Sequence, residues 1–396
     1  MWSPQQEKAL ADVNRWLKAN DKPYYQLAGY AGTGKTTLAR HLAEAVSGRV
    51  HFAAFTGKAA HVLMKAGVPN ASTIHKLIYN PKDKSQQRLK ELEAERAKLR
   101  VANPIPETLL NKIEAAIKAE QANLARPMFQ LNLESDLRGA ALVVVDEYSM
   151  IDGQMGEDLL SFGVPILALG DPGQLPPVRG APFFRGRPDT LLTEIHRQAA
   201  DNPILWMSRE VREGRNLRPG VYGESTVSRY RDVKSELAQK VLDADQLLVG
   251  RNTTRQSSNR RTRELMGHSN PLPLEGDKLI CLRNNHEVGL LNGQMWEART
   301  DSRFDGSYVI LDLLGEEDQQ VDVLAHPEYF HGNTPGVWTR KDAEEFDYGY
   351  AITVHKSQGS QWENVLLFDE WHGNDREKWL YTGLTRAADR IDVIQM

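Results

Sequence analysis

The sequence predicts an α/β fold built on parallel sheets, and three observations carry this prediction. Several strand-like segments are unbroken apolar runs, as in parallel strands that are buried on both faces. Segments with helical patterns separate the early runs, which is the alternation of a doubly wound sheet. A glycine-rich loop, Gly29–Thr36, lies between a short apolar run, Tyr24–Leu27, and an amphipathic segment, Leu38–Val46.

This loop has the form G-x-x-x-x-G-K-[ST], which in a strand–loop–helix context predicts phosphate binding. Glycines let consecutive backbone N–H groups point inward around phosphate oxygens. Lys35 would reach the β- and γ-phosphates, Thr36 would ligate Mg²⁺, and the start of the helix adds positive dipole. A glycine-rich turn that only opens a helix is the alternative, but a chance match in such a chain is expected at about one per cent. The residues predicted to bind ATP here are Gly29, Gly32, Thr33, Gly34, Lys35, Thr36 and Thr37.

The other strands are predicted from apolar runs along the whole chain. They are Val50–Phe55, Ala141–Val145, Val164–Leu169, Gln246–Val249, Lys278–Leu282, Tyr308–Leu313, Val365–Phe368 and Ile391–Ile394. No repeat of fixed period is present.

Composition is that of an ordinary soluble globular protein, with 40% hydrophobic and 26% charged residues. The net charge of −4 argues against a wholly basic nucleic-acid binder, but it is compatible with a basic groove. The single cysteine, Cys281, excludes an internal disulfide, and we expect it to be a buried strand thiol in a cytoplasmic protein. No signal peptide or membrane-spanning run is recognisable.

Two segments depart from the α/β pattern. Residues 82–126 are rich in Lys, Glu, Ala, Gln and Leu and predict two antiparallel helices joined at Asn103–Pro106. The helical pattern predicts a seam between them, formed by Leu89, Leu92, Arg96 and Leu99 with Leu109, Ile113, Ala116 and Ile117. Residues 270–345 carry strand-like pieces and glycine-containing turns, which predict a small all-β insertion.

Two further turns follow apolar strands and carry polar side chains. Asp146 and Glu147 end one strand, where Asp146 would hold Mg²⁺ and Glu147 would accept a proton from the attacking water or orient it. Asp171 and Gln174 lie in the next turn, where the Gln174 amide could sense a γ-phosphate through one hydrogen bond. Each turn taken alone is also compatible with a purely structural role.

Taken in order, these motifs resemble those of superfamily 1 helicases, in the branch that contains RecD and Dda. The match runs from Ser3–Ala9 through Phe55–Ala60 and Ser72–Lys76 to Glu194–Arg197, Thr353–Gly359 and Tyr381–Ala387. The Gln-Leu-Pro-Pro form at residues 174–177 resembles this branch rather than the one that translocates 3′ to 5′. The chain differs from relatives of RecD at Ser360-Gln361, and residues 82–126 replace a β-hairpin wedge with a helical segment.

The resemblance implies roles for individual residues. Gln6 would read the adenine edge, Arg197 and Arg386 would act as arginine fingers, and Gln358 and Gly359 would couple the nucleotide state to the grip on DNA. Contacts to the phosphates and sugars of single-stranded DNA would come from Thr56, Lys58, Thr73, His75, Asn252, Arg255, Thr353 and His355. His75 and His355 could instead be structural histidines, and the cluster Arg260–Arg263 could be either a DNA contact or a solvated helix face.

The sequence therefore predicts two RecA-like P-loop NTPase domains, with a helical insertion in the first and an SH3-like insertion in the second. The first domain would comprise residues 1–81 and 127–185, and the second residues 186–269 and 346–396; the insertions would be residues 82–126, a candidate strand-separating wedge, and 270–345. We expect a monomeric, ATP- and Mg²⁺-dependent helicase that moves 5′ to 3′ on single-stranded DNA and acts at single/double-strand junctions.

Two alternatives remain open. One is a translocase that displaces proteins and unwinds weakly, and the other is a nucleotide-switched subunit of a recombination or replication complex. Partners would be single-strand-binding, replication or recombination proteins.

Overall fold

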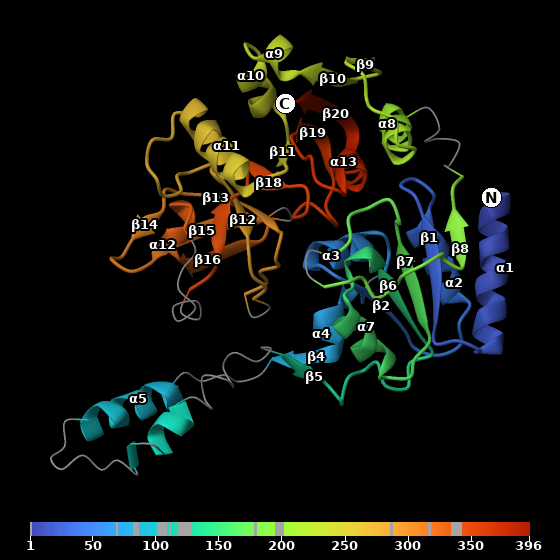
Figure 1. Ribbon diagram of the computed structural model, residues 1–396, viewed down its shortest axis with the longest axis horizontal. Coiled ribbons are helices and arrows are strands. Elements are labelled where there is room, and N and C mark those ends of the chain that lie inside the picture. Colours follow the sequence, from blue (N-terminus) through green and yellow to red (C-terminus); the bar gives the residue numbers. More distant parts are fainter. Residues whose placement is uncertain are drawn as a thin grey trace. The chain divides into compact units, whose positions relative to one another are not determined.

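The structure is a computed structural model that describes most of the chain (Figure 1). The described residues are 2–68, 70–81, 87–100, 109–110, 112–117, 129–177, 180–194, 202–285, 288–315, 318–333 and 343–396. They divide into two compact units, one of residues 1–74 and 139–396 and one of residues 75–138.

The first sheet of the larger unit is parallel throughout, with the strand order β3-β2-β6-β7-β1-β8. Its strands, in chain order, are β1 (Tyr24–Gly29), β2 (Val50–Ala54), β3 (Ser72–Thr73), β6 (Leu142–Asp146), β7 (Ile166–Gly170) and β8 (Thr190–Leu192). The helices that accompany it are α1 (Pro4–Ala19), α2 (Lys35–Glu44), α3 (Gly57–Lys65) and α7 (Gly153–Leu160), with a 3-10 turn at Tyr148–Met150. The parallel, doubly wound prediction is confirmed for this sheet. Because β8 belongs to it, the expected domain boundary after residue 185 is too early.

The second sheet is parallel except at one edge, with the order β18-β11-β19-β20-β10-β9. Its strands are β9 (Gly220–Tyr222), β10 (Ser225–Arg229), β11 (Gln246–Val249), β18 (Ala351–Thr353), β19 (Trp362–Asp369) and β20 (Ala387–Gln395). The helices connected to these strands are α8 (Pro203–Arg212), α9 (Tyr230–Val233), α10 (Leu237–Asp243), α11 (Asn252–Leu265) and α13 (Arg376–Leu384).

A third, antiparallel sheet interrupts the second one in sequence. Its order is β14-β15-β13-β12-β17, and β16 pairs with β15. The elements are β12 (Lys278–Cys281), β13 (Met295–Ala298), β14 (Arg303–Phe304), β15 (Val309–Gly315), β16 (Gln320–Ala325), α12 (Pro327–Phe330) and β17 (Phe346–Tyr348). Since β17 belongs to this sheet, the expected end of the insertion at residue 345 is too early. Cys281 is buried in β12, and burial raises the pKa of its thiol to about 12.

The smaller unit contains the two-stranded pair β4 (Tyr79–Pro81) and β5 (Phe129–Leu131) and the helix α5 (Gln87–Arg100). Helix α4 (Ile74–Ile78) precedes β4, and residues 112–117 are also helical. Leu92, Ile113 and Ile117 are buried together, as the predicted seam requires, whereas Leu109 is 45% exposed and does not belong to it. The predicted turn Asn103–Pro106 and the side chain of Leu89 lie outside the described residues.

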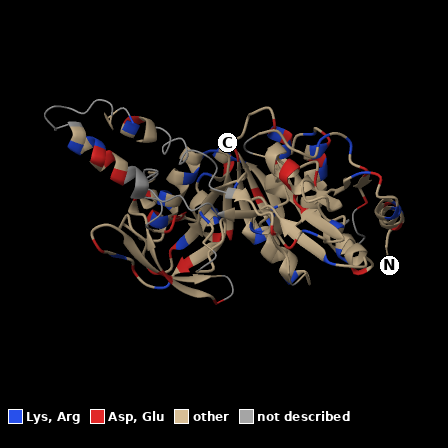
Figure 2. Cartoon of the chain, turned by 90° about the horizontal axis from the view of Figure 1, so that it is seen from below, with Lys and Arg blue, Asp and Glu red and all other residues tan. Residues whose placement is uncertain are grey.

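Charges of both signs are interleaved over the described residues (Figure 2). In the described part of the chain, no helix is long and apolar enough to cross a membrane.

Candidate nucleotide site and nucleic-acid interface

The loop between β1 and α2 is shaped for close approach of phosphate to backbone. Gly32 and Gly34 both have φ of 77°, a left-handed conformation that glycine adopts without strain. At Gly29 a β-carbon would lie 2.6 Å from Oγ1 of Thr33, so the turn is too tight for any side chain there. Helix α2 begins at Lys35 with Gly34 as its N-cap, so no side chain competes for the first backbone N–H groups.

The Lys35 ammonium lies over this loop. Its Nζ donates to the carbonyl oxygens of Gly29, at 2.6 Å, and of Tyr30, at 3.2 Å. In these two bonds the Lys35 ammonium donates N–H groups that the motif assigns to phosphate oxygens. The next two residues differ, because Thr36 is half-buried and faces β6, whereas Thr37 is exposed.

Two carboxylates stand at the end of β6, facing the loop. Thr36 Oγ1 lies 3.5 Å from Oδ2 of Asp146, and Oδ1 of Asp146 accepts the backbone N–H of Glu147 at 2.8 Å. Glu147 has φ of 56°, which is unusual for a residue other than glycine and often marks a functional turn.

Both carboxyls are harder to ionise than usual. Burial raises the pKa of Asp146. Burial raises the pKa of Glu147 to about 7, and the Asp146 carboxylate adds to this, while the charges of Arg386 and Lys35 oppose it.

The donor set here fits Mg²⁺. Thr36 and Asp146 supply a hydroxyl and a carboxylate oxygen, and a magnesium ion bound with a nucleotide takes few protein ligands of this kind. Among the described residues, no group of three or more His, Cys, Asp and Glu side chains is placed so that it could hold a metal ion.

Arg386 reaches the same charge cluster from the second sheet. It lies in the turn between α13 and β20 and is only 7% exposed. Its guanidinium donates to the carbonyls of Thr382 and Ser360 and to Oγ1 of Thr385, each at 3.1 Å. Burial lowers the pKa of Arg386, and the attraction of Glu147 opposes this. The structure thus places Lys35 and Arg386 within electrostatic reach of Glu147, whereas Arg197 lies outside the described residues.

The turn after β7 connects the two sheets. Oε1 of Gln174, a buried residue, has no hydrogen-bond partner among the described residues, so this amide oxygen is available to a ligand. The next residue, Leu175, packs in the core of the second sheet, and its N–H donates to Thr382 Oγ1 at 3.0 Å. Gln358 Nε2 donates to the carbonyl of Leu175 at 3.1 Å, which links the two motifs.

Gln6 is already engaged in the structure. Its Oε1 accepts the N–H of Ser3 at 2.9 Å in a capping box of α1, and its Nε2 donates to the Thr33 carbonyl at 3.0 Å. An amide oxygen can accept two hydrogen bonds and an amide NH2 group can donate two, so these two bonds do not by themselves preclude a contact with adenine.

Sequence reasoning assigned no role to Tyr381. Its hydroxyl donates to Oδ2 of Asp171 at 2.6 Å and accepts the N–H of Ala31 in the phosphate loop at 3.1 Å. Tyr381 stands five positions before Arg386 in a matched motif, and this spacing was the available signal.

The predicted DNA contacts of the first sheet lie at the start of α3 and at β3. Oγ1 of Thr56 caps α3 by accepting the N–H of Ala59 at 3.1 Å. Lys58 Nζ lies 5.0 Å from the ring centre of Trp362, a residue of β19. Thr73 is buried. His75 belongs to the smaller unit, where its ring lies 5.5 Å from that of Tyr79.

Gly359 joins the two sets of motifs. It has φ of 76°, and a β-carbon there would lie 3.0 Å from Oγ1 of Thr56. The loop after β18 therefore packs directly against the first predicted DNA-contact residue.

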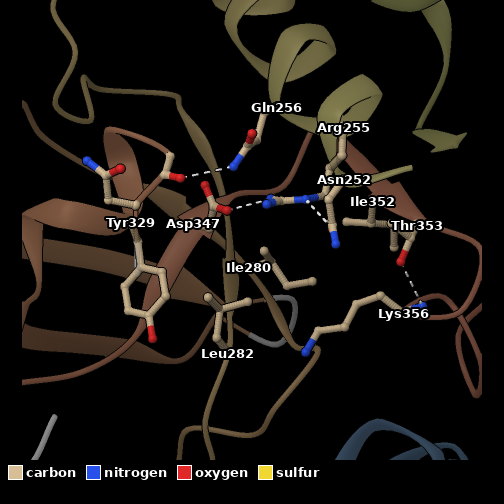
Figure 3. Close-up of a pocket in the computed structure, with 12 residues that line it drawn as sticks. Asn252, Arg255, Gln256, Ile280, Leu282, Tyr329, Asp347, Ile352, Thr353 and Lys356 are labelled. Atoms are coloured by element: carbon tan, nitrogen blue, oxygen red, sulfur yellow. Dashed lines mark hydrogen bonds and ion pairs between the residues drawn. The ribbon is translucent and has the colours of Figure 1, made fainter. Parts of the chain in front are cut away.

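Three predicted DNA contacts of the second sheet share a pocket of about 240 Å³ (Figure 3). Asn252, Arg255 and Thr353 line it together with Lys356. Nε of Arg255 donates to Oδ1 of Asn252 at 3.3 Å, and its Nη1 pairs with Asp347. His355 is half-buried 5.7 Å from the ring of Trp371, and burial lowers its pKa, so its imidazole is neutral at pH 7.

The basic cluster on α11 divides between solvent and core. Arg260 and Arg261 are exposed. Arg263 is 5% exposed: it binds both carboxylate oxygens of Asp277, donates to the carbonyls of Asn270 and Leu272, and lies 4.3 Å from the ring centre of Tyr348. The suggestion that Arg263 contacts a DNA backbone is therefore wrong, because all its donor groups face the third sheet.

The phosphate loop between β1 and α2 and the two mainly parallel sheets define the class of protein, a P-loop NTPase. Residues 2–232 match the AAA domain family, and residues 348–393 match the UvrD-like helicase C-terminal domain. The chain is 26% identical over 398 residues to the ATP-dependent RecD2 DNA helicase of Deinococcus radiodurans, covering 92% of this chain and 46% of that protein. It is 27% identical over 226 residues to the ATP-dependent DNA helicase dda of Enterobacteria phage T4, covering 53% of this chain and 42% of that one. The chain thus spans under half the length of these two relatives.

Solved structures of Pif1 helicases share the fold. The Pif1 helicase from Candida albicans superposes with a TM-score of 0.52 at 18% identity, covering 100% of this chain and 94% of that one. Bacteroides Pif1 bound to single-stranded DNA superposes with a TM-score of 0.53 at 16% identity, covering 99% and 92%. The chain belongs to the AAA domain family, and it is similar to helicases of the RecD2, Dda and Pif1 types.

Proposed function

We propose that this chain is an ATP-dependent DNA helicase that translocates 5′ to 3′ on single-stranded DNA. Hydrolysis of Mg-ATP would take place between its two RecA-like domains, and domain closure and opening would alternate the grip on DNA. The support comes from the order of the motifs, from the family to which the chain belongs and from the relatives named as DNA helicases.

One observation carries the proposal. Glu147, which follows β6 of the first sheet, interacts electrostatically with Lys35 and with the buried Arg386, which comes from the second sheet. A protein that only binds a nucleotide does not need a buried arginine from a second sheet near a carboxyl group of raised pKa. An enzyme that hydrolyses the γ-phosphate does, because charge develops on that group in the transition state.

Each residue has a separate task in this proposal. Lys35 and the loop amides bind the phosphates, and Glu147 accepts the proton of the attacking water. Gln174 offers an amide oxygen that has no hydrogen-bond partner among the described residues, and Arg386 stabilises the transition state. Thr36 and Asp146 would hold Mg²⁺, which neutralises phosphate charge when bound. Arg197 is proposed as a second arginine finger on the resemblance alone.

DNA would follow the starts of α3 and α11 and the loop after β18. There Thr56, Lys58, Thr353 and the pocket of Asn252 and Arg255 offer polar groups suited to phosphate and sugar. The contact of Gly359 with Thr56 would let a change in the nucleotide site alter these DNA contacts.

The test of this proposal is the ATPase rate of the purified chain with and without naked single-stranded DNA. A motor predicts a strong rise in turnover with DNA. Turnover that is indifferent to DNA would favour the nucleotide-switched subunit instead.

A further inference from the structure

Tyr381 is buried where three segments of the larger unit meet. It is 1% exposed in the last turn of α13, and its hydroxyl contacts Ala31 of the phosphate loop and Asp171 of the turn after β7. The second oxygen of Asp171 accepts the N–H of Gly173 at 2.9 Å, which fixes the carboxylate in place. A single hydroxyl thus bridges the nucleotide loop and the second sheet.

The ring of Tyr381 is held independently of its hydroxyl. A β-carbon on Gly173 would lie 2.9 Å from the ring, so glycine there lets the turn pack flat against it. The ring of Tyr30 approaches edge-on, with centroids 6.5 Å apart. Replacement by phenylalanine should therefore keep the packing and remove only the two hydrogen bonds.

The hydroxyl keeps its proton. Burial and the neighbouring Asp171 carboxylate both raise the pKa of Tyr381 well above its usual range. At any physiological pH the hydroxyl therefore donates its one proton to Asp171 and accepts the N–H of Ala31 with its oxygen.

Tyr381 is linked to Arg386 through the short segment of chain and the hydrogen bonds between them. The carbonyl of Tyr381 accepts the N–H of Thr385 at 3.1 Å, and Arg386 is held by the carbonyl of Thr382 and the hydroxyl of Thr385. A shift of the α13 end relative to the phosphate loop would therefore move the Arg386 guanidinium away from Glu147. Even a small displacement of such a group slows the reaction, because it stabilises the transition state only when it lies close to the developing charge.

We propose that Tyr381 is a positioning residue for ATP hydrolysis: its hydroxyl ties α13 to the phosphate loop and to Asp171, and so places Arg386. This inference rests on the proposed function, because it assigns Arg386 to the transition state. Tyr381 itself touches neither the phosphates nor the water in this account.

Tyr381→Phe tests the inference, with Tyr25→Phe as the matched control. Tyr25 is also buried, and its hydroxyl lies 2.7 Å from Thr190 Oγ1 within the first sheet. We expect kcat for ATP to fall about tenfold in Tyr381→Phe, as for the loss of a hydrogen bond to a charged group, with KM changed less than about threefold. Tyr25→Phe should melt at a similar temperature to Tyr381→Phe and keep the wild-type kcat.

The decisive measurement combines Tyr381→Phe with Arg386→Ala in single-turnover hydrolysis. If Tyr381 acts through Arg386, its replacement should slow the Arg386→Ala enzyme less than about twofold. A full tenfold loss in that background, or an unchanged kcat in Tyr381→Phe alone, would overturn the inference. If Tyr381→Phe does not fold, Asp171→Asn should lower kcat in the same direction and show the same dependence on Arg386.

These rates can be measured on basal hydrolysis without DNA. If DNA does not change the ATPase rate, the proposed helicase function is contradicted. The coupling between Tyr381 and Arg386 is measured separately, so the two hypotheses can fail independently.

Discussion

Binding and water activation are assigned to different residues of the nucleotide site, and this division can be tested. Glu147→Gln keeps the size of the side chain but cannot take a proton, so turnover should fall at least about 100-fold while ATP still binds. Lys35→Ala removes the ammonium that faces the loop and should abolish hydrolysis. Turnover and binding of a fluorescent ATP analogue would be measured side by side. Hydrolysis by Glu147→Gln at the wild-type rate would show that Glu147 is not the base.

Arg386 should act on the transition state more than on bound ATP. Arg386→Ala should lower DNA-stimulated turnover about 10³-fold and change nucleotide affinity by less than about tenfold. Steady-state kinetics and equilibrium binding with the same protein give the two numbers. Equal losses in both would place the arginine in ground-state binding.

Individual residues were predictable where a motif fixes both type and position. The structure places Lys35 near Asp146 and Glu147, and Arg386 near Glu147, because the neighbours of these residues in sequence set the local backbone. Arg263 was misjudged because its partners, Asp277 and the carbonyls near residue 270, come from another segment that periodicity cannot place. Tyr381 was overlooked for the same reason, since both of its partners are distant in sequence.

At the scale of elements, α11 is attached to the third sheet by a buried ion pair. Arg263→Ala would leave Asp277, which is fully buried, without its main counter-charge. We expect a loss of about 3–5 kcal/mol in the free energy of unfolding, measured by urea denaturation. Arg260→Ala, on the exposed face of the same helix, is the control and should change stability by less than about 0.5 kcal/mol. A small effect at Arg263 would mean that the pair is not closed in solution.

The segment between β4 and β5 can be removed without cutting either main sheet. Pro81 and Phe129 pair across the two strands, so a short Gly/Ser linker in place of Lys84–Ala125 can close a hairpin. If this segment is the strand-separating wedge, ATPase stimulated by single strands should persist, whereas duplex unwinding should fall sharply. A folded deletion variant that unwinds a 5′-tailed duplex at the normal rate would move the wedge elsewhere, with residues 270–345 as the next candidate.

Element types were more predictable than domain boundaries. All eight strands predicted from apolar runs exist. In the parallel sheets, strands such as β7 and β11 are buried on both faces and therefore need continuous hydrophobicity. The boundaries were set too early because β8 and β17 are three-residue strands. Strands this short carry no periodic signal, and their pairing partners are distant in sequence.

At the scale of the whole molecule, the two main sheets are coupled through a few close contacts. Gly359 packs on Thr56, Leu175 enters the core of the second sheet, and Tyr381 contacts the phosphate loop. Each contact joins a segment of the proposed nucleotide site or of the proposed DNA path on one sheet to a segment on the other. This arrangement is what a motor needs, because hydrolysis must change the grip on DNA.

The central claim is most directly tested by strand displacement on duplexes that carry a 5′ tail, a 3′ tail or no tail. With ATP and Mg²⁺, we predict unwinding of the 5′-tailed duplex, little on the other two, and none by Lys35→Ala. Preferential unwinding of the 3′-tailed duplex would contradict the direction proposed here. ATP hydrolysis stimulated by DNA without displacement of any duplex would contradict the helicase itself and leave a translocase.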